Sequence, residues 1–544
     1  MFNPEDLATE LLRQAADLEQ ARSQLDTHLE EIASRVLPSH AGTFLTQGQN
    51  VNPGAKKNDL MYDATAALSL TKFAAVLEDL LTPRNSKWHR LVPTDKALLR
   101  NRQARDWYEQ AADLLFAYRM APKTNYSDQK QMDYLQVGAF GTSALFIDKL
   151  AGGPGLRYKS CHLADIFIRE NHQGMVDTVY RRIRWTARQA VQMFGDLLPQ
   201  EITDAAGKTP DKEYVFWHCV EPRKDFDPQR VDHKGMPWAS YYVAVTGKKV
   251  LKEGGYQTFP YSIGRHVVAP GEVYGRSPAM MVLPNIKVLN EQKRTLLKQG
   301  HRAVDPVLLM HDDGILDTFS LKPGAMNAGG VSANGQPLVH ALPVGNLPLM
   351  KELMEDERHI IRDAFYVTLF EILVQDRREM TATEFLGRAR EKGILLAPAM
   401  GRQQSEALGP QIDREIDLLM QQGLLPPMPQ VIKDARGEYK AEYDSPMSRA
   451  ARAEEAMGFI QWAESLLKIA NEPQNPAALD WIDIDSAAPE LADIRAVPLR
   501  WVRTVEAVTA ARKGREQAQG VQQLIDAAPA VAGLVKAGAG TGGL

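Results

Sequence analysis

The stretch SPAMMVLPNIKVLNEQKRTLLKQGHRA (residues 277–303) carries most of the information about the fold. After its prolines, apolar residues such as Ile286, Leu289 and Leu296 recur at helical spacing, which predicts an amphipathic helix. The helix is basic, because Glu291 alone opposes five cationic side chains. These are Lys287, Lys293, Arg294, Lys298 and Arg302.

A second helix is predicted at residues 347–371, where the charge balance is reversed, with three basic residues and six acidic ones. Residues 304–346 between the two helices have no helical period and contain short apolar segments and turn clusters such as Lys322-Pro323-Gly324, which predict a small β-rich insertion. This order indicates an antiparallel helix pair with a small tip domain. The apolar positions of the second helix are Leu349, Leu353, Ile360, Ala364, Val367 and Phe370.

The basic side of the first helix has two interpretations at this stage. In the first, it is a helix face that is solvated or paired with the acidic helix. In the second, it is a surface that contacts nucleic acid. The whole chain has a formal net charge of −4 over 544 residues. That balance is not typical of a protein that grips nucleic acid tightly, but it is compatible with one past which DNA slides.

The rest of the chain predicts a predominantly helical α+β protein with more than one packed unit. Upstream, helices are expected at residues 4–36, 63–81 and 93–121. Gly138–Asp148 looks like a turn that enters a buried strand, and further strand segments recur up to residue 245.

Downstream of the helix pair, residues 372–379 form a short polar stretch that contains Arg377 and Arg378. A capping box of Thr381 and Glu384 then opens a long helix. Prolines at 398 and 410 should kink or segment that helix. The remaining residues are Ala-rich and are expected to be helical, with a frayed Gly-rich tail.

Motifs for catalysis or metal binding are weak. Gly207-Lys208-Thr209 resembles the end of a phosphate-binding loop, but the required earlier glycine is replaced by Ile202. Cys161-His162 and His218-Cys219 contain the only two cysteines, and adjacent strand residues point to opposite faces, so buried strands are the better interpretation. We therefore expect no enzymatic activity, no metal, no cofactor, no secretory signal and no membrane span.

Five short motifs, in this order and spacing, make the chain resemble the head-to-tail connecting (portal) proteins of podoviruses. The resemblance covers roughly residues 55–450. The motifs are Met61-Tyr62-Asp63-Ala64-Thr65 with Leu80-Leu81-Thr82-Pro83 and Trp88, Gly141-Thr142-Ser143-Ala144-Leu145, Tyr274-Gly275-Arg276-Ser277-Pro278-Ala279, Met380-Thr381-Ala382-Thr383-Glu384, and Gly423-Leu424-Leu425-Pro426.

The resemblance implies a ring of about twelve subunits with head-to-tail contacts. It also implies the domain order of portal proteins. The ranges would be a wing region at 1–275, a first stem helix at 276–303, a clip at 304–346, a second stem helix at 347–371, a tunnel loop at 372–380, a long kinked helix of wing and crown at 381–430, and a helical crown with a flexible tail at 431–544.

The same resemblance implies partners and site residues. The partners would be other copies of the chain, double-stranded viral DNA that is held transiently and without sequence preference, the terminase, tail adaptor proteins, and capsid and scaffolding proteins. The ring would be assembled in the host cytoplasm and would occupy a capsid vertex of the virion. Arg377 and Arg378, with the five basic residues of the first helix, would line the DNA channel. The clip surface would include Asp312, Asp313, Asp317 and Lys322.

Two other classes of protein compete with this interpretation. One is another ring-forming virion component, such as a tail adaptor or hub protein, and the other is an enzyme of the packaging machinery, such as a nuclease or an ATPase. Electron microscopy separates the first, because a portal has a wide ring with a narrow stem. A hydrolysis assay with DNA and ATP separates the second.

Overall fold

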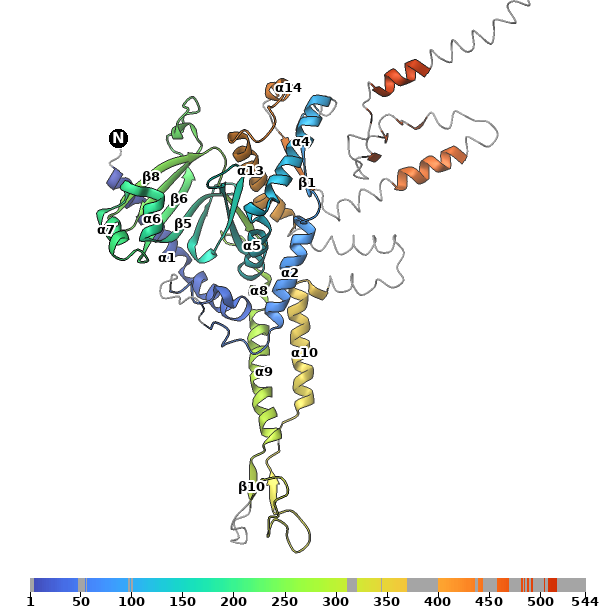
Figure 1. The fold of residues 1–544 in the computed structure, drawn as a ribbon. Helices are drawn as coiled ribbons and strands as arrows, with labels where there is room; N and C mark the ends of the chain where they lie inside the picture. The colour runs from blue at the N-terminus through green and yellow to red at the C-terminus, as the bar shows by residue number, and fades with distance from the viewer. Residues whose placement is uncertain are drawn as a thin grey trace, which may run out of the picture. The chain divides into compact units, whose positions relative to one another are not determined.

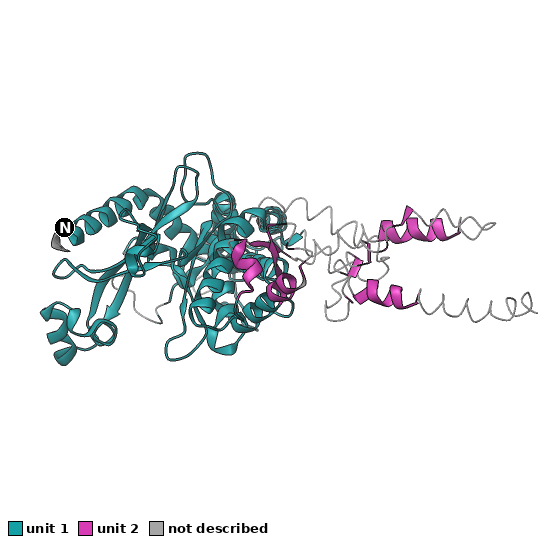
Figure 2. Ribbon diagram, turned by 90° about the horizontal axis from the view of Figure 1, so that it is seen from above, with its two compact units in different colours: residues 1–88, 110–427 teal, residues 89–109, 428–544 magenta. Residues whose placement is uncertain are grey.

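A computed structural model describes the following parts of the chain: residues 4–46, 54, 56–95, 98, 101–310, 320–343, 345–368, 400–435, 439–443, 457–468 and 507–515, and a few single residues between 481 and 503. Two compact units are distinguished (Figure 2). The first comprises residues 1–88 and 110–427, and the second comprises residues 89–109 and 428–544.

The larger sheet of the first unit is antiparallel and has the strand order β4-β5-β6-β7-β8. Helix α1 (Pro4–Val36) covers one face with Ala8 and Leu11, which contact Trp217 and Cys219 of β6. Phe216, the residue before Trp217 in β6, packs instead with α6 and α7 on the other face, because successive residues of a strand point to opposite faces. The strands are β4 Ile166–Glu170, β5 Val176–Thr186, β6 Glu213–Pro222, β7 Trp238–Ala244 and β8 Lys249–Tyr256.

A three-stranded antiparallel sheet with the order β3-β2-β9 forms the second layer of this unit. Helix α5 packs against β2 and β3 and against α2, and α13 packs near β2 and β9. The bounds are α2 Thr65–Leu81, α5 Tyr126–Phe140, β2 Thr142–Lys149, β3 Leu156–Cys161, β9 Tyr261–Arg265 and α13 Gly409–Gln421.

The prediction of a turn at Gly138 is wrong. Gly138 lies inside α5, where a Cβ atom would approach Leu70 Cδ1 to 2.6 Å, so the glycine serves close packing between α5 and α2. The turn begins only at Gly141, which ends α5 with a φ of 75° in the left-handed region. The buried strand predicted within Gly138–Asp148 is confirmed as β2, which begins at Thr142.

The paired helices follow the sheets. Helix α8 spans Pro278–Met281 and α9 spans Leu283–Val304, while α10 spans Leu347–Ala364. The short strands β10 (Leu308–Met310) and β11 (Val339–Ala341) pair antiparallel between them (Figure 1). The prediction that the second helix runs unbroken to residue 371 is wrong, because Tyr366 has a φ of 59°, which a right-handed helix does not accept. Residue 371 itself lies outside the described residues.

The helix expected at residues 93–121 is shorter than predicted. Residues His89–Pro93 form strand β1, which pairs antiparallel with β12 (Tyr439–Tyr443) in the second unit. Helix α4 begins only at Arg102 and ends at Arg119. The partner of β1 is far away in the sequence, so local periodicity gave no sign of it.

Pro410 lies in the first turn of α13, after a π-helical turn η6 (Gln403–Leu408), and so it separates two helical segments as predicted. Pro398 and the capping box at 381–384 lie outside the described residues. The remaining elements are α6 Ala187–Phe194, α7 Gln200–Lys208, α14 Gln430–Asp434, and the turns η1 Pro38–His40, η2 Pro122–Thr124, η3 Leu163–Asp165, η4 Gly195–Leu197 and η5 His233–Gly235.

Candidate functional site

Helices α9 and α10 lie side by side and are antiparallel (Figure 1). Helix α9 runs toward the β10–β11 ribbon, and α10 runs back from it. One polar contact fixes their relative height: Asn285 Nδ2 of α9 donates to Glu357 Oε2 of α10 at 2.9 Å. Asn346 caps α10 by accepting from the Leu349 N–H at 3.2 Å. The pair is therefore two laterally bonded helices with the short β10–β11 ribbon beyond their ends (Figure 1).

The sequence motif at residues 61–65 contacts α9. Asn290 is buried, and its Oδ1 accepts from the backbone N–H groups of Tyr62 at 2.7 Å and Asp63 at 3.0 Å. Its Nδ2 donates to the Ile286 carbonyl at 2.8 Å, so the amide has partners on both ends. A buried amide satisfied in this way holds one geometry.

Asp63 connects the same segment to α10. Its Oδ2 accepts from Arg358 Nη2 at 2.7 Å, while its Oδ1 accepts from the Thr65 N–H at 2.9 Å at the start of α2. Burial opposes ionisation of Asp63, but the hydrogen bonds from Thr65 and Arg358 outweigh it and lower the pKa of this carboxyl. Residues 62–63 therefore hold both helices of the pair at their root, and we call this contact the root junction.

Two other motifs meet behind α8. Gly141 and Gly275 lie back to back, so that a Cβ atom on Gly275 would stand 2.2 Å from the Gly141 carbonyl oxygen. Thr142 Oγ1 accepts from the Gly275 N–H at 2.8 Å. Ser277 donates to the Ala139 carbonyl at 2.8 Å and caps α8 by accepting from the Met280 N–H at 2.9 Å. The start of the helix pair is thus fixed to α5 and β2.

The predicted basic residues of α9 lie in different surroundings. Lys287 pairs with Glu31 of α1 at 2.8 Å. Arg294 pairs with Glu291 at 3.5 Å, and its guanidinium lies over the Tyr62 ring, 5.9 Å from the centroid. Lys293 is half-buried, and Lys298 and Arg302 are exposed. The structure therefore gives Lys287 a partner within the subunit and leaves Lys298 and Arg302 in solvent.

The other predicted site residues are mostly outside the described part of the chain. This holds for Arg377 and Arg378 and for the three aspartates at 312, 313 and 317. Lys322 is described, and it is exposed beside the ribbon. Exposed apolar side chains surround the same ribbon, among them Val307, Leu321 and Met326.

Apolar side chains on the outside of the helix pair are a feature that sequence reasoning missed. Met354 and Ile361 of α10 are buried, but Leu349, Leu353 and Ile360, three of the apolar positions named from the sequence, are 51%, 46% and 45% exposed. Val288 of α9 is 45% exposed. We call these four residues, Val288, Leu349, Leu353 and Ile360, the apolar face. Periodicity alone could not separate them from the buried stripe, since both stripes run along one short helix.

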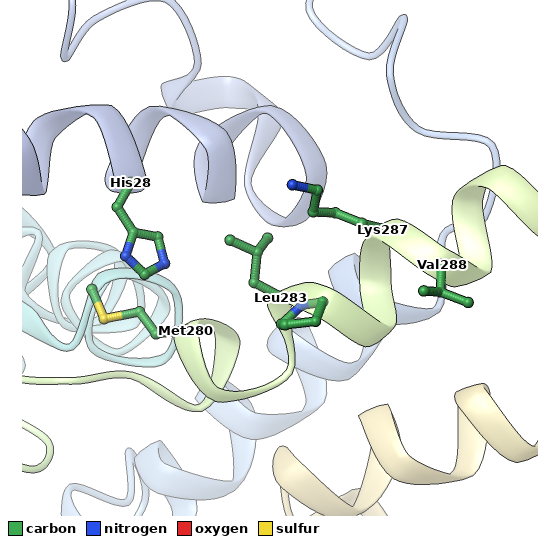
Figure 3. A pocket seen from close by; sticks show the side chains of 6 residues that line it. His28, Met280, Leu283, Lys287 and Val288 are labelled. Carbon is green, nitrogen blue, oxygen red and sulfur yellow. The ribbon is translucent and has the colours of Figure 1, made fainter.

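A pocket of about 460 Å³ adjoins the apolar face where α1 meets α8 and α9 (Figure 3). His28 points into it from α1, Met280 and Leu283 line its floor, and Val288 belongs to both the pocket and the apolar face. Pro284 and the stem of Lys287 complete the lining. The lining is mainly apolar, which suits a hydrophobic side chain better than an ion.

The weaker motifs lie where no site forms within the described residues. Gly207 and Lys208 end α7, whereas a phosphate-binding loop precedes a helix. His218 bonds Tyr261 and Ser240 on one face of the sheet, and Cys219 packs under α1 on the other. In the part of the chain that the structure describes, no cluster of three His, Cys, Asp or Glu side chains could hold a metal ion. No helix in those same ranges is both long and apolar enough to cross a membrane.

Comparison with known proteins identifies the family. Residues 8–502 match the model of the bacteriophage head to tail connecting proteins. The chain is 28% identical over 522 residues to a probable portal protein of Bordetella phage BPP-1, and the match covers 94% of this chain and 92% of that protein. It is 26% identical over 526 residues, with the same coverage, to a portal protein of Salmonella phage epsilon15.

The chain therefore belongs to the bacteriophage head to tail connecting protein family. Its function is that of a head–tail connector of a phage, as the family and both relatives indicate. The α+β fold predicted from the sequence agrees with the mixture of helices and sheets in the structure.

Proposed function

We propose that about twelve copies of this chain close into a portal ring, which forms the channel for DNA packaging and ejection at a capsid vertex. The observation that carries the proposal is the exposed apolar face of the helix pair. Half-exposed aliphatic side chains along one side of a helix pair are costly in water and are typical of a surface that another chain covers. In a ring, every copy covers the same surface of its neighbour.

We assign the predicted portal parts to the described elements. Helices α8 and α9 form the first stem helix, α10 forms the second, and residues 304–346 with the β10–β11 ribbon form the clip. The sheets and helices before residue 276 form the wing. Residues 372–380 form the tunnel loop, 381–430 the long kinked helix, and 431–544 the crown and tail.

The clip and the channel have different partners in this proposal. We assign the exposed Lys322 and the aspartates at 312, 313 and 317 to the clip surface, which would bind the terminase during packaging and tail adaptor proteins afterwards. The wing would contact capsid and scaffolding proteins. The ring would be assembled in the host cytoplasm and kept in the virion.

DNA would be contacted by few cations per subunit. Lys293, Arg294, Lys298 and Arg302 of α9, together with Arg377 and Arg378, are the residues that we assign to the channel, while Lys287 is assigned to its contact with α1. Each cation that neutralises a phosphate strengthens binding and makes it more salt-dependent, so a conduit needs few of them. The net charge of −4 agrees with this requirement.

The test is the mass and shape of the purified protein. Native mass spectrometry should give a closed oligomer of about twelve subunits, and negative-stain images should show a wide ring with a narrow stem. A monomer, or a ring with no stem, would contradict the proposal and favour an adaptor protein. Hydrolysis of ATP or DNA by the purified ring should stay at background, because the proposed function is not enzymatic.

A further inference from the structure

A second exposed apolar surface lies at the start of α2. Leu60, Tyr62 and Leu68 are 54%, 43% and 62% exposed, and we call these three residues the α2-start patch. The patch is next to the root junction, because the Tyr62 N–H is bonded to Asn290 of α9. The subunit therefore presents two apolar surfaces beside one helix pair.

The two surfaces lie on opposite sides of the helix pair. Asn290 and Arg358 mark the side that holds residues 62–63. A residue advances about 100° around an α-helix, so Val288 lies about 160° from Asn290, and Leu353 lies about 140° from Arg358. The apolar face therefore points away from the α2-start patch, and within one subunit the helix pair separates them.

Leu353, in the middle of the apolar face, also lies at about the height of the contact between Asn290 and Tyr62. The bond between Asn285 and Glu357 marks a common level on the antiparallel helices. Asn290, which binds Tyr62, is five residues beyond that level on α9, and Leu353 is four residues before Glu357 on α10. With a rise of about 1.5 Å per residue, Asn290, which accepts the Tyr62 N–H, and Leu353 differ in height along the pair by only about 1.5 Å.

The two sides of α10 also differ in charge. Lys351 and Arg362 lie on the side of Arg358, toward residues 62–63, since the spacings of seven and four residues bring them onto one stripe. Asp356 and Asp363 lie beside Leu353 and Ile360 on the other side. One side is thus apolar and acidic. The other side carries Lys351 and Arg362 beside Arg358, whose charge is already paired with Asp63 and Glu355 in the same subunit.

We propose that, in the assembled ring, the apolar face of one copy covers the α2-start patch of the next copy. The inference rests on the proposed ring. With the ring axis parallel to the helix pair, the rotation that relates neighbouring copies leaves every residue at the same height along that axis. Residues at equal height on opposite sides of the pair then meet, and the acidic and basic sides of α10 face each other. The pocket beside Val288 extends the covered surface and accepts an apolar side chain of the neighbour.

The first test is cross-linking of the full chain with the two substitutions Tyr62→Cys and Leu353→Cys. Both native cysteines, Cys161 and Cys219, are buried, so the introduced thiols are the reactive ones. A short bismaleimide should convert the double variant into a covalent ladder that ends at the mass of the closed ring. Each single variant should stay monomeric on a denaturing gel, and an equimolar mixture of the two should give dimers only.

The matched control is the pair Leu297→Cys and Leu353→Cys. Leu297 is 46% exposed and lies on the same side as Asn290, but seven residues farther along α9, which is about 10 Å away in height. This control should remain monomeric on the gel.

Two outcomes would overturn the inference while the ring proposal stands. One is equal cross-linking of the test pair and the control pair. The other is an intact ring in which the thiols introduced at residues 62 and 353 do not cross-link. Absence of any ring in the unmodified protein would instead overturn the ring proposal.

A second variant tests the surface without cysteines. Ile360→Asp places a charge in the apolar face but on a side chain that is already exposed in the subunit, so the far-ultraviolet circular dichroism should not change. The fraction of rings at equal subunit concentration should fall at least tenfold. His359→Asp, one residue away and outside the apolar face, should assemble normally. Normal assembly of the Ile360→Asp variant would also overturn the inference.

Discussion

Two of the sequence motifs, those that contain Gly141 and Gly275, need glycine at these positions. Gly141 and Gly275 approach each other so closely that neither position has room for a Cβ atom. The approach lets β2 and the segment before α8 share the hydrogen bond from the Gly275 N–H to Thr142 Oγ1. The start of the helix pair therefore depends on two residues without side chains.

Gly275→Ala is expected to lower the free energy of unfolding by about 3 kcal/mol or more, because the clash is with backbone and cannot be relieved by a side-chain rotation. Chemical denaturation of the purified protein measures the change. Gly207→Ala is the control: no atom lies within 4 Å of its Cβ position inside α7, so the substitution should be neutral or slightly stabilising. Similar losses in both variants would refute this explanation.

At the root junction, Asp63→Asn should cost about 2 kcal/mol, since it removes a charge-assisted hydrogen bond at a nearly buried carboxylate. The pKa of Asp63 is lowered in the folded protein, so its contribution is present above the pKa of the unfolded chain and is lost as the pH falls through the folded pKa. Denaturation at pH 7 measures the effect. Asp59→Asn, which breaks the exposed pair with Lys56, should change stability by less than about 0.5 kcal/mol.

At the scale of elements, the sequence predicted the helix, β insertion and helix order and the α+β class, because amphipathic periods and turn clusters are local signals. It did not predict strand β1 or the late start of α4, since the pairing partner of β1 is β12, far along the chain. It identified Leu353 and Ile360 as apolar positions of the second helix but did not show that they are about half exposed. Which of two apolar stripes is buried depends on neighbouring elements, and those are not visible in one helix.

The candidate site was predictable to the same extent. The basic residues of α9 could be named from composition, but the pairing of Lys287 with Glu31 joins elements 256 positions apart in the sequence. The root junction could not be found either, because Asn290 and Asp63 are ordinary polar residues in their local context. Their function follows only from the contact between the segment before α2 and the helix pair.

The segment after α10 supplies a prediction about DNA. The double substitution Arg377→Ala and Arg378→Ala should leave ring assembly intact but reduce DNA retention or packaging, because two cations per subunit would be removed from the channel. Genome content of purified particles and titre measure the effect. The control is Lys249→Ala with Lys252→Ala, two exposed lysines of the edge strand β8, which should package normally. Full genome content in the arginine variant would exclude this function for the loop.

At the scale of the whole molecule, buried histidines predict sensitivity to acid. Burial lowers the pKa of His40 and His218 to about 3 and that of His162 and His266 to about 4. Histidine in the unfolded chain has a pKa of about 6.5, so below that pH unfolding takes up protons that the folded protein does not bind. Stability is therefore full above about pH 6.5 and falls as the pH decreases toward 4.

Each of these histidines can lower the free energy of unfolding by up to about 1.4 kcal/mol for each pH unit of acidification in that interval. Denaturant midpoints at pH 7.5, 6 and 5, at fixed protein concentration, measure the slope. His218→Gln, which keeps a side chain able to bond Tyr261 or Ser240 but does not titrate, should reduce the slope relative to the unmodified protein. A midpoint that is the same at pH 7.5, 6 and 5 would contradict the prediction.

The β1–β12 ribbon also has a consequence for the order of events on the ribosome. Pro93 pairs with Tyr439, so roughly 350 residues must be synthesised before β1 meets its partner strand. At a translation rate of about 5–20 residues per second, β1 waits about 20–70 s with this edge unpaired. During that time the first unit has most of its chain available to fold, whereas the second cannot close. Nascent chains arrested before residue 439 should accordingly leave β1 open to other strands, and chaperone binding to β1 should end once β12 has emerged.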